Sequence, residues 1–310
     1  MQRNLYIPLQ KGVISMGANI YKNKKPMLFF LIPAFLFMTV FLYYPFMQNI
    51  LNSTQVISEL GAPAKGMNDP WYMNYVQMFQ DENMLMAFKN TLIMMMVTIV
   101  GQVGIALVLA LLVDNIKTGA KFFRTVYFFP IVVSATALGL LFNLVFLYDK
   151  GMLNQLLEMF GVKELTDWKN ESLALITMMI PVMWQYVGFY FVLLITGLNN
   201  VSDELYEAAA IDGATKLQRV RFISIPLLHN VICTCVVLAV TGALKVFDLP
   251  WTMFPKGMPL GKTWLTGTYM YHQTFNARNI DYSSAIAVVI VLLGIITSKI
   301  VNKIFKEKDY

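Results

Sequence analysis

The sequence predicts an all-α, polytopic membrane protein with about six transmembrane helices. The first observation is composition: 57% of the 310 residues are hydrophobic and 14% are charged, whereas a soluble domain is about half apolar and about a quarter charged. The second is a mean hydropathy of +0.57. The third is the placement of the charges, which leaves apolar runs of the roughly 20 residues that a helix needs to cross a bilayer.

Six runs of the sequence carry few or no charged residues and are the expected spans. They cover residues 27–50, 90–116, 125–148, 172–202, 222–244 and 282–298. The last run is short, but the hydrocarbon stem of Lys299 can lie along the apolar core with its ammonium at the surface, so this span is expected to continue to Asn302. We therefore predict one transmembrane domain over residues 27–304, with terminal segments 1–26 and 305–310 on the same side of the membrane.

The lysine and arginine residues set the expected orientation, because short cytoplasmic loops are enriched in them. With both termini in the cytoplasm, the larger share of the 24 basic residues falls inside. These residues are Arg3, Lys11, Lys22, Lys24, Lys25, Lys117, Lys121, Arg124, Lys216, Arg219, Arg221, Lys299, Lys303, Lys306 and Lys308. The sequence therefore predicts cytoplasmic termini.

The same placement accounts for the net charge of +6. Basic residues at membrane boundaries follow topology and the anionic lipid surface, so contact with membrane lipid is expected and nucleic-acid binding is not. The first run is too long for a cleaved signal peptide and lacks a small-residue cleavage pattern at its end. Cys233 and Cys235 fall two residues apart in one span and are expected to be packing residues, with neither a disulfide nor a metal implied.

The segment between the fourth and fifth spans, residues 199–226, differs from a simple polar connector. Ser202 can cap a helix whose first turn carries Asp203 and Glu204, where acidic side chains suit the positive end of the helix dipole. Three consecutive alanines, residues 208–210, would let the backbone of this helix come close to another protein. The pattern indicates a helix on the membrane surface.

A turn and a second short helix are expected after this first one. Asp212 and Gly213 interrupt the helix, because glycine readily adopts the left-handed conformation that a sharp reversal requires. The polar side of the second helix carries Lys216, Arg219 and Arg221. Such a helix–turn–helix can fit into a groove on a partner and transmit the partner's movement.

This segment resembles a known family. The string EAAAIDGAT at residues 207–215, followed by Ile223, Ile225 and Pro226, is similar to the EAA motif of the permeases of binding-protein-dependent ABC importers, in the maltose-type branch that imports sugars. The resemblance extends over most of the chain. Its further positions are Asn90-Thr91-Leu92, Phe123-Arg124, Phe129-Pro130, Gly151, Asn154, Trp184 and Gly188.

The resemblance implies the type I ABC importer permease fold and a transport subunit of a bacterial inner membrane. It implies four kinds of partner: a second permease, two cytoplasmic ATPase subunits that bind ATP and Mg²⁺, an extracytoplasmic solute-binding protein, and a carbohydrate, in the first instance an oligosaccharide. No cofactor is expected on this chain itself, and no catalytic residue. An ATP-driven importer is therefore the function that the resemblance predicts.

The resemblance also assigns a role to the loop 199–226, which in such importers docks into a cleft on the ATPase. Closure of the ATPase pair then rocks the membrane helices between inward and outward access. On this comparison, Glu207 and Asp212 are expected to make polar contacts with the ATPase. Ala208, Ala209 and Gly213 are expected to provide a close fit.

Motifs for independent chemistry are absent from the sequence. Residues 257–263 (GMPLGKT) approach a phosphate-binding loop but are one residue too short, and no strand is expected before them. His229 and His272 are the two histidines, and the predicted topology puts them on opposite sides of the membrane, which excludes a shared histidine metal site. The energy for transport must therefore come from a partner.

Polar residues within the spans are candidates for the solute path, because they are costly in lipid and usually face a cavity or the bundle interior. Amide and hydroxyl groups beside aromatic rings suit a sugar, which has a flat apolar face and polar edges. The candidates are Asn143, Trp184, Gln185, Tyr186, Tyr190 and Thr241. Lys245 and Asp248 are further candidates, although two opposite charges three residues apart on a helix can instead neutralise each other.

Three alternatives stay open at this point. The same machinery can carry a non-sugar solute such as a polyol phosphate. A self-sufficient secondary transporter or channel would not need the loop 199–226, and no internal repeat relates the two halves of the chain. A membrane enzyme would need a catalytic constellation, and no serine nucleophile elbow or zinc-protease motif is present.

Overall fold

The computed structural model describes residues 24–57, 59, 61–114 and 119–305. Within these residues the chain is helical, with one isolated antiparallel bridge between Gln55 and Met67 and no strand, which confirms the predicted all-α class. The predicted terminal segments fall outside the described residues, except for residues 24–26 and 305. The described chain divides into two compact units between Leu51 and Asn52.

The first unit is one long helix that confirms the first predicted span. It consists of α2 (Lys24–Met38), the π-helical turn η1 (Thr39–Tyr43) and α3 (Tyr44–Asn52). Residues 28–52 are long and apolar enough to cross a membrane, and the most apolar stretch of this helix has no side chain buried by the chain itself. Exposed apolar side chains along a whole helix are those of a span that lipid or another protein covers.

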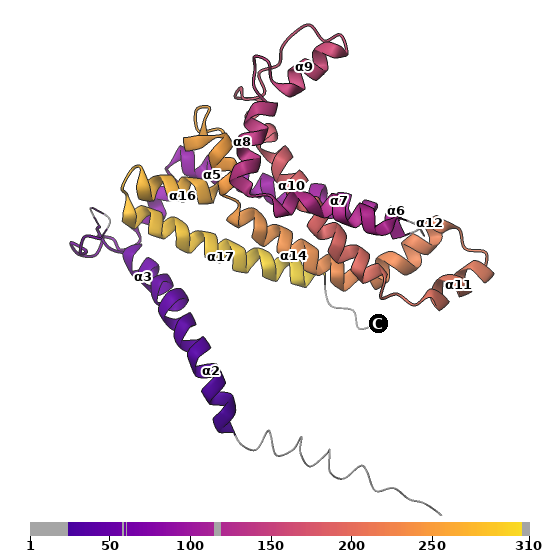
Figure 1. Ribbon diagram of the computed structural model, residues 1–310. Coiled ribbons are helices and arrows are strands. Elements are labelled where there is room, and N and C mark those ends of the chain that lie inside the picture. The colour runs from indigo at the N-terminus through magenta and orange to yellow at the C-terminus, as the bar shows by residue number, and fades with distance from the viewer. Residues whose placement is uncertain (1–23, 58, 60, 115–118, 306–310) are drawn as a thin grey trace, which may run out of the picture. The chain divides into compact units, whose positions relative to one another are not determined.

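The second unit contains the other helices (Figure 1). They are α4 (Met73–Met78), α5 (Glu82–Val97), η2 (Thr98–Gly104), α6 (Ile105–Asp114), α7 (Ala120–Val132), α8 (Ala135–Val145), α9 (Met152–Met159), α10 (Ala174–Leu198), α11 (Asp203–Ile211), α12 (Lys216–Arg219), η3 (Val220–Ser224), α13 (Ile225–Leu227), α14 (His229–Lys245), α15 (Asp248–Met253), η4 (Pro255–Gly257), α16 (Thr266–Phe275) and α17 (Ile280–Ile304). Together with the first helix, the described residues provide five helices able to cross a membrane, or six if α7 and α8 count as one bent span.

The third span differs from the single helix expected over residues 125–148. α7 and α8 meet at an angle of 94°, because Val133 and Ser134 have extended ψ angles of 137° and 133°. An extended residue leaves backbone groups without helical partners. The side-chain amide of Gln185 in α10 donates to the Val133 backbone oxygen at 3.4 Å. The break could not be predicted from the apolar run, because the hydrogen bond that satisfies the Val133 oxygen comes from a helix remote in sequence.

The helix of the fifth span begins later than expected, whereas the helix of the sixth span ends where expected. Phe222 lies in η3, and Pro226 occupies the first turn of the short α13, so the helix of the fifth span starts at His229, later than predicted. The sixth span continues as one helix through Lys299 to Ile304. That continuation confirms the predicted extension to Asn302.

Helix α10 forms the centre of the second unit. It packs against α6, α7, η2 and α14, and its Phe191 and Leu194 are completely buried. The closest approach is at Gly188, where an added Cβ would lie 1.7 Å from the backbone oxygen of Tyr127 in α7. Glycine is therefore the residue that allows the two backbones to touch.

Polar side chains tie together the end of the unit that contains the start of α5, α16 and residues 254–265, which we call the distal end. Asn90 donates through Nδ2 to the backbone oxygens of residues 262 and 264 at 2.8 and 2.9 Å. Asp81 accepts through Oδ2 from the hydroxyls of Tyr269 and Tyr282 at 2.6 and 2.8 Å. These bonds fix the segment before α16 against α5 and α17.

His272 in α16 gives the distal end a pH-dependent contribution to stability. Its ring lies 5.0 Å from that of Trp264, and its Nδ1 is buried without a hydrogen-bond partner in the described part of the chain. Burial lowers the pKa of His272, and the charge of Lys256 lowers it further, while a hydrogen bond with Asn276 opposes the change. The unfolded chain therefore binds this proton more tightly than the folded protein does.

We expect the His272 contribution to be fully present above the usual histidine pKa of about 6.5 and to be lost as the pH falls through the lowered value, because stability rises with pH where the unfolded state binds more protons. The apparent Tm in detergent, measured from pH 7.5 down to pH 5, should fall below pH 6.5. His272→Gln should flatten this part of the curve. An unchanged pH profile in the variant would contradict the assignment.

Candidate functional site

Residues 199–226 form the helix–turn–helix that the sequence predicts, here called the elbow. α11 begins after Ser202, whose Oγ accepts the backbone N–H of Glu204 at 3.3 Å. The helix ends at Ile211, and Gly213, two residues later, has a φ of +76°. The backbone N–H of Ala214 donates to the oxygen of Ala209 at 2.9 Å, and that of Gly213 to residue 210 at 3.1 Å, as in a Schellman motif. The turn is therefore closed by its own backbone.

A capping box that we did not predict begins the second helix of the elbow. The backbone N–H of Thr215 donates to Oε1 of Gln218 at 2.7 Å, and the backbone N–H of Gln218 donates to Oγ1 of Thr215 at 3.4 Å. A Thr followed three residues later by Gln is the sequence signal for this arrangement. Both arms of the elbow are thus capped at their N-termini.

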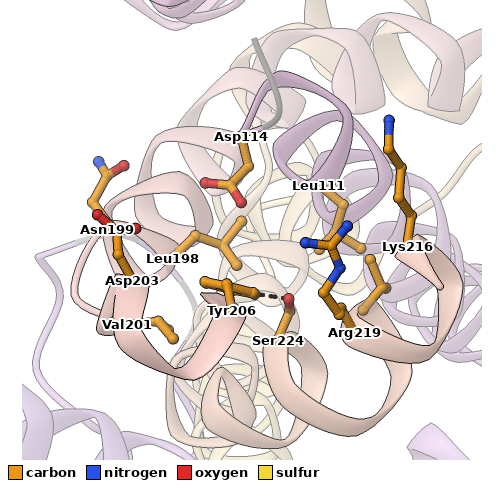
Figure 2. A pocket seen from close by; sticks show the side chains of 11 residues that line it. Leu111, Asp114, Leu198, Asn199, Val201, Asp203, Tyr206, Lys216, Arg219 and Ser224 are labelled. Atoms are coloured by element: carbon orange, nitrogen blue, oxygen red, sulfur yellow. Dashed lines mark hydrogen bonds between the residues drawn. The ribbon is translucent and has the colours of Figure 1, made fainter. Parts of the chain in front are cut away.

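A cavity of 570 Å³ lies between the elbow and the C-terminal ends of α6 and α10 (Figure 2). Across it, the hydroxyls of Tyr206 in α11 and Ser224 in η3 are 3.0 Å apart and hydrogen-bonded. Asp114 and Asp203 border the cavity, as do Lys216 and Arg219. The charged walls suit a surface that meets water or a polar partner.

The other side of the elbow carries a groove of 320 Å³ beside exposed apolar side chains. Ala209, Asp212 and Gly213 line this groove together with Phe222. Phe222 is 67% exposed, and Ile211 and Leu217, which belong to the elbow but do not line the groove, are 88% and 76% exposed. Large exposed apolar side chains gathered on one short element are typical of a protein-binding surface.

The five residues expected to contact an ATPase divide into two groups. Ala209, Asp212 and Gly213 line the groove, whereas Glu207 and Ala208 are exposed on α11 without lining it. None of the five is buried: α11 contains no buried residue, and Asp212 and Gly213, which follow it, are exposed. Their roles stay predictions, but their accessibility agrees with them.

Two of the six residues expected on the solute path border a common cavity. Tyr186 and Tyr190 of α10 line a space of 340 Å³ that also meets Lys245 of α14. Thr98 and Gln102 of η2 complete its polar lining. We did not single out these last two, although both are polar residues inside the second predicted span and the same rule would have found them.

The other four candidates do not line this cavity and have internal contacts. Asn143 donates to the backbone oxygen of Thr252 at 3.1 Å, and Thr241 donates to that of Val237 within its own helix at 2.8 Å. Trp184 is 46% exposed and packs edge-on against Phe142, and Gln185 supports the break between α7 and α8.

Lys245 and Asp248 form no ion pair with each other in the described structure. Lys245 is the last residue of α14, and two non-helical residues separate it from Asp248, which starts α15. The three-residue spacing therefore does not place them on one helix face. Lys245 is exposed and borders the cavity of Tyr186 and Tyr190.

Comparison with known proteins identifies similar chains over nearly the whole length. Residues 102–308 match the family described as binding-protein-dependent transport system inner membrane component. The probable ABC transporter permease protein YurN of Bacillus subtilis is 33% identical over 93% of this chain and 98% of its own length. The lactose transport system permease protein LacF of Rhizobium radiobacter is 28% identical over 87% of this chain and 90% of its own.

A solved structure has the same fold. A chain of a bacterial alginate ABC transporter, in complex with an alginate pentasaccharide-bound periplasmic protein, superposes with a TM-score of 0.80. The match covers 94% of this chain and 99% of the other at 20% sequence identity. The expected permease fold is thereby confirmed.

Proposed function

The chain belongs to the family of binding-protein-dependent transport system inner membrane components, and on this premise we propose that it is a permease subunit of an ATP-driven carbohydrate importer. It is a multi-pass membrane protein. With a second permease it encloses the solute path, and an extracytoplasmic binding protein delivers the solute. A lactose permease among its relatives supports a sugar as the solute, and the likeness to the alginate transporter supports an oligosaccharide.

The observation that carries the coupling role is the exposed, capped elbow. Ala209 and Gly213 line a groove together with Phe222. The first helix of the elbow, α11, has no buried residue. A small, rigid projection with apolar rim residues is suited to insertion into a cleft of another protein. We propose that this cleft belongs to a cytoplasmic ATPase, which binds ATP and Mg²⁺.

Each predicted contact residue has a defined place in this proposal. Glu207 and Asp212 make polar contacts with the ATPase, and Ala208, Ala209 and Gly213 leave room for its side chains. The elbow and both termini then face the cytoplasm, in agreement with the basic residues Lys216, Arg219 and Arg221. Closure of the ATPase pair moves the elbow and, with it, the membrane helices.

Reconstitution tests this function. The partner binding protein is first screened against neutral, acidic and phosphorylated sugars by thermal shift. The chain is then incorporated into proteoliposomes together with the second permease and the ATPase. We expect uptake of the stabilising sugar that requires ATP inside and the binding protein outside. Uptake by this chain without an ATPase, or a binding protein that responds only to non-carbohydrate solutes, would contradict the proposal.

A further inference from the structure

The cavity between the elbow and the ends of α6 and α10, here called the elbow cavity, carries charges of both signs. Its acidic side chains are Asp114 and Asp203, and its basic side chains are Lys216 and Arg219. In Figure 2 the two acidic side chains lie toward one side of the cavity and the two basic ones toward the other. No two of these four groups form an ion pair in the part of the chain that the structure describes, so their charges are open to a ligand.

The two sides of the elbow cavity suit ligand groups of opposite charge. Asp114 is the last residue of α6, and Asn199 directly follows the last residue of α10. The C-terminal end of a helix carries partial negative charge, which adds to the attraction of the carboxylates for a cation. The basic side suits an anion, because a lysine ammonium and an arginine guanidinium both bind phosphate. A small group with a phosphate and a cation matches both sides.

The size of the elbow cavity and its apolar lining fit an amphiphilic ligand. The volume of 570 Å³ falls within the range of about 300 to 1,000 Å³ that is usual for small-molecule pockets. Beside the charged groups, the lining contains four apolar side chains: Leu111, Leu198, Val201 and Val220. A ligand that fills the cavity therefore has an apolar part next to its charged part.

An apolar surface continues from the elbow cavity along α6. Ile105, Val108 and Leu112 are 48%, 57% and 63% exposed. Val108 precedes Leu111 of the cavity lining by three residues, so the two share one side of the helix. α6 ends the helical stretch Glu82–Asp114, which is long and apolar enough to cross a membrane. The apolar surface therefore lies at the depth of the lipid tails, and the cavity lies at the depth of the headgroups.

We propose that the elbow cavity binds a membrane lipid whose headgroup carries a phosphate and a primary ammonium, as that of phosphatidylethanolamine does. The phosphate lies against Lys216 and Arg219, the ammonium lies against Asp114 and Asp203, and the acyl chains follow the exposed side of α6. A primary ammonium donates hydrogen bonds to the carboxylates, which a quaternary ammonium cannot do. A headgroup with a phosphate and no ammonium brings negative charge toward the carboxylates.

Titration of short-chain lipids into the assembled transporter tests this site. The transporter is freed of native lipid in detergent and titrated by calorimetry with the dioctanoyl forms of phosphatidylethanolamine, phosphatidylcholine and phosphatidylglycerol. Glycerophosphoethanolamine, which has the headgroup without the chains, is the fourth probe. We expect the Kd for dioctanoyl phosphatidylethanolamine to be at least about fivefold lower than that for each of the other three. Equal affinity for the three lipids would overturn the proposal, and equal affinity for the free headgroup would show that the ligand is a soluble zwitterion.

Two variants locate this binding in the elbow cavity. Lys216→Gln removes a charge from the phosphate side, and Asp203→Asn removes one from the ammonium side. We expect each variant to raise the Kd for dioctanoyl phosphatidylethanolamine about fivefold. The variants should differ toward phosphatidylglycerol, which lacks an ammonium: Lys216→Gln should weaken its binding, whereas Asp203→Asn should leave it equal or strengthen it. Arg219 is left unchanged, because it also lines the groove on the other side of the elbow.

Arg221→Gln and Glu204→Gln are the matched controls. Arg221 and Glu204 are exposed on the elbow and do not line the elbow cavity, so their replacement changes the net charge equally and leaves the cavity intact. The Kd for dioctanoyl phosphatidylethanolamine should stay within about twofold of the wild-type value. Equal weakening by the cavity variants and the controls would overturn the proposal, since binding would then follow overall charge. None of these measurements involves uptake, so that result would leave the proposed transport function untouched.

Discussion

Replacement of Gly213 by leucine is expected to abolish uptake while the protein still inserts and folds. The φ of Gly213 is +76°, and an added Cβ would meet no atom of the described residues within 4 Å. The backbone strain of a non-glycine residue here is about 1 to 2 kcal/mol, too little to unfold the chain. The leucine side chain would instead fill the groove of the elbow, so uptake should fall below about a tenth of the wild-type rate.

Gly161 provides a matched control for this prediction. It has a φ of +88°, and an added Cβ there also meets no described atom within 4 Å, but it follows α9, outside the elbow. Gly161→Leu should carry similar strain and leave uptake near normal. Measurements of membrane-inserted protein and of uptake separate the two effects. Normal uptake by Gly213→Leu would argue strongly against coupling through the elbow.

Replacement of Gly188 by alanine is expected to cause the largest loss of stability. A Cβ at this position would lie 1.7 Å from the Tyr127 oxygen and 2.3 Å from its carbonyl carbon. Both atoms belong to the backbone, so relief requires α7 and α10 to separate along their length. We expect a destabilisation of about 3 kcal/mol or more, seen as a lower Tm and less folded protein in the membrane.

Gly242→Ala is the matched control for this packing prediction. Gly242 also lies within a membrane helix, but an added Cβ there meets nothing within 4 Å in the part of the chain that the structure describes. Because alanine favours a helix by about 1 kcal/mol over glycine, its Tm should stay equal or rise. A Tm for Gly188→Ala as high as that of Gly242→Ala would contradict the prediction, because it would show that α7 and α10 can separate without loss of stability.

Local features of the chain could be predicted from the sequence because they depend on only a few neighbouring residues. The cap at Ser202 and the reversal at Gly213 each depend on neighbours within one helical turn, and both are present. The apolar runs likewise located the spans, because bilayer thickness alone sets their length. The capping box at Thr215 was equally local and was overlooked.

Features that depend on remote segments were not accessible. The side-chain amide of Gln185 bonds to the backbone oxygen of Val133 at the break between α7 and α8, and Val133 is far away in the chain. Likewise, the cavity of Tyr186 brings Thr98 to α10 and α14 through packing that no spacing in the sequence encodes. The sequence therefore identifies the polar residues inside the spans, but the groups that they contact are known only from the structure.

The hydroxyl pair of Tyr206 and Ser224 has a mechanical consequence. It ties α11 to the end of η3, and η3 passes through α13 directly into α14. Force applied to α11 therefore reaches α14 without crossing the buried centre around α10. The stiffness of the short connection through η3 and α13 limits how much of the movement of α11 is lost before it reaches α14.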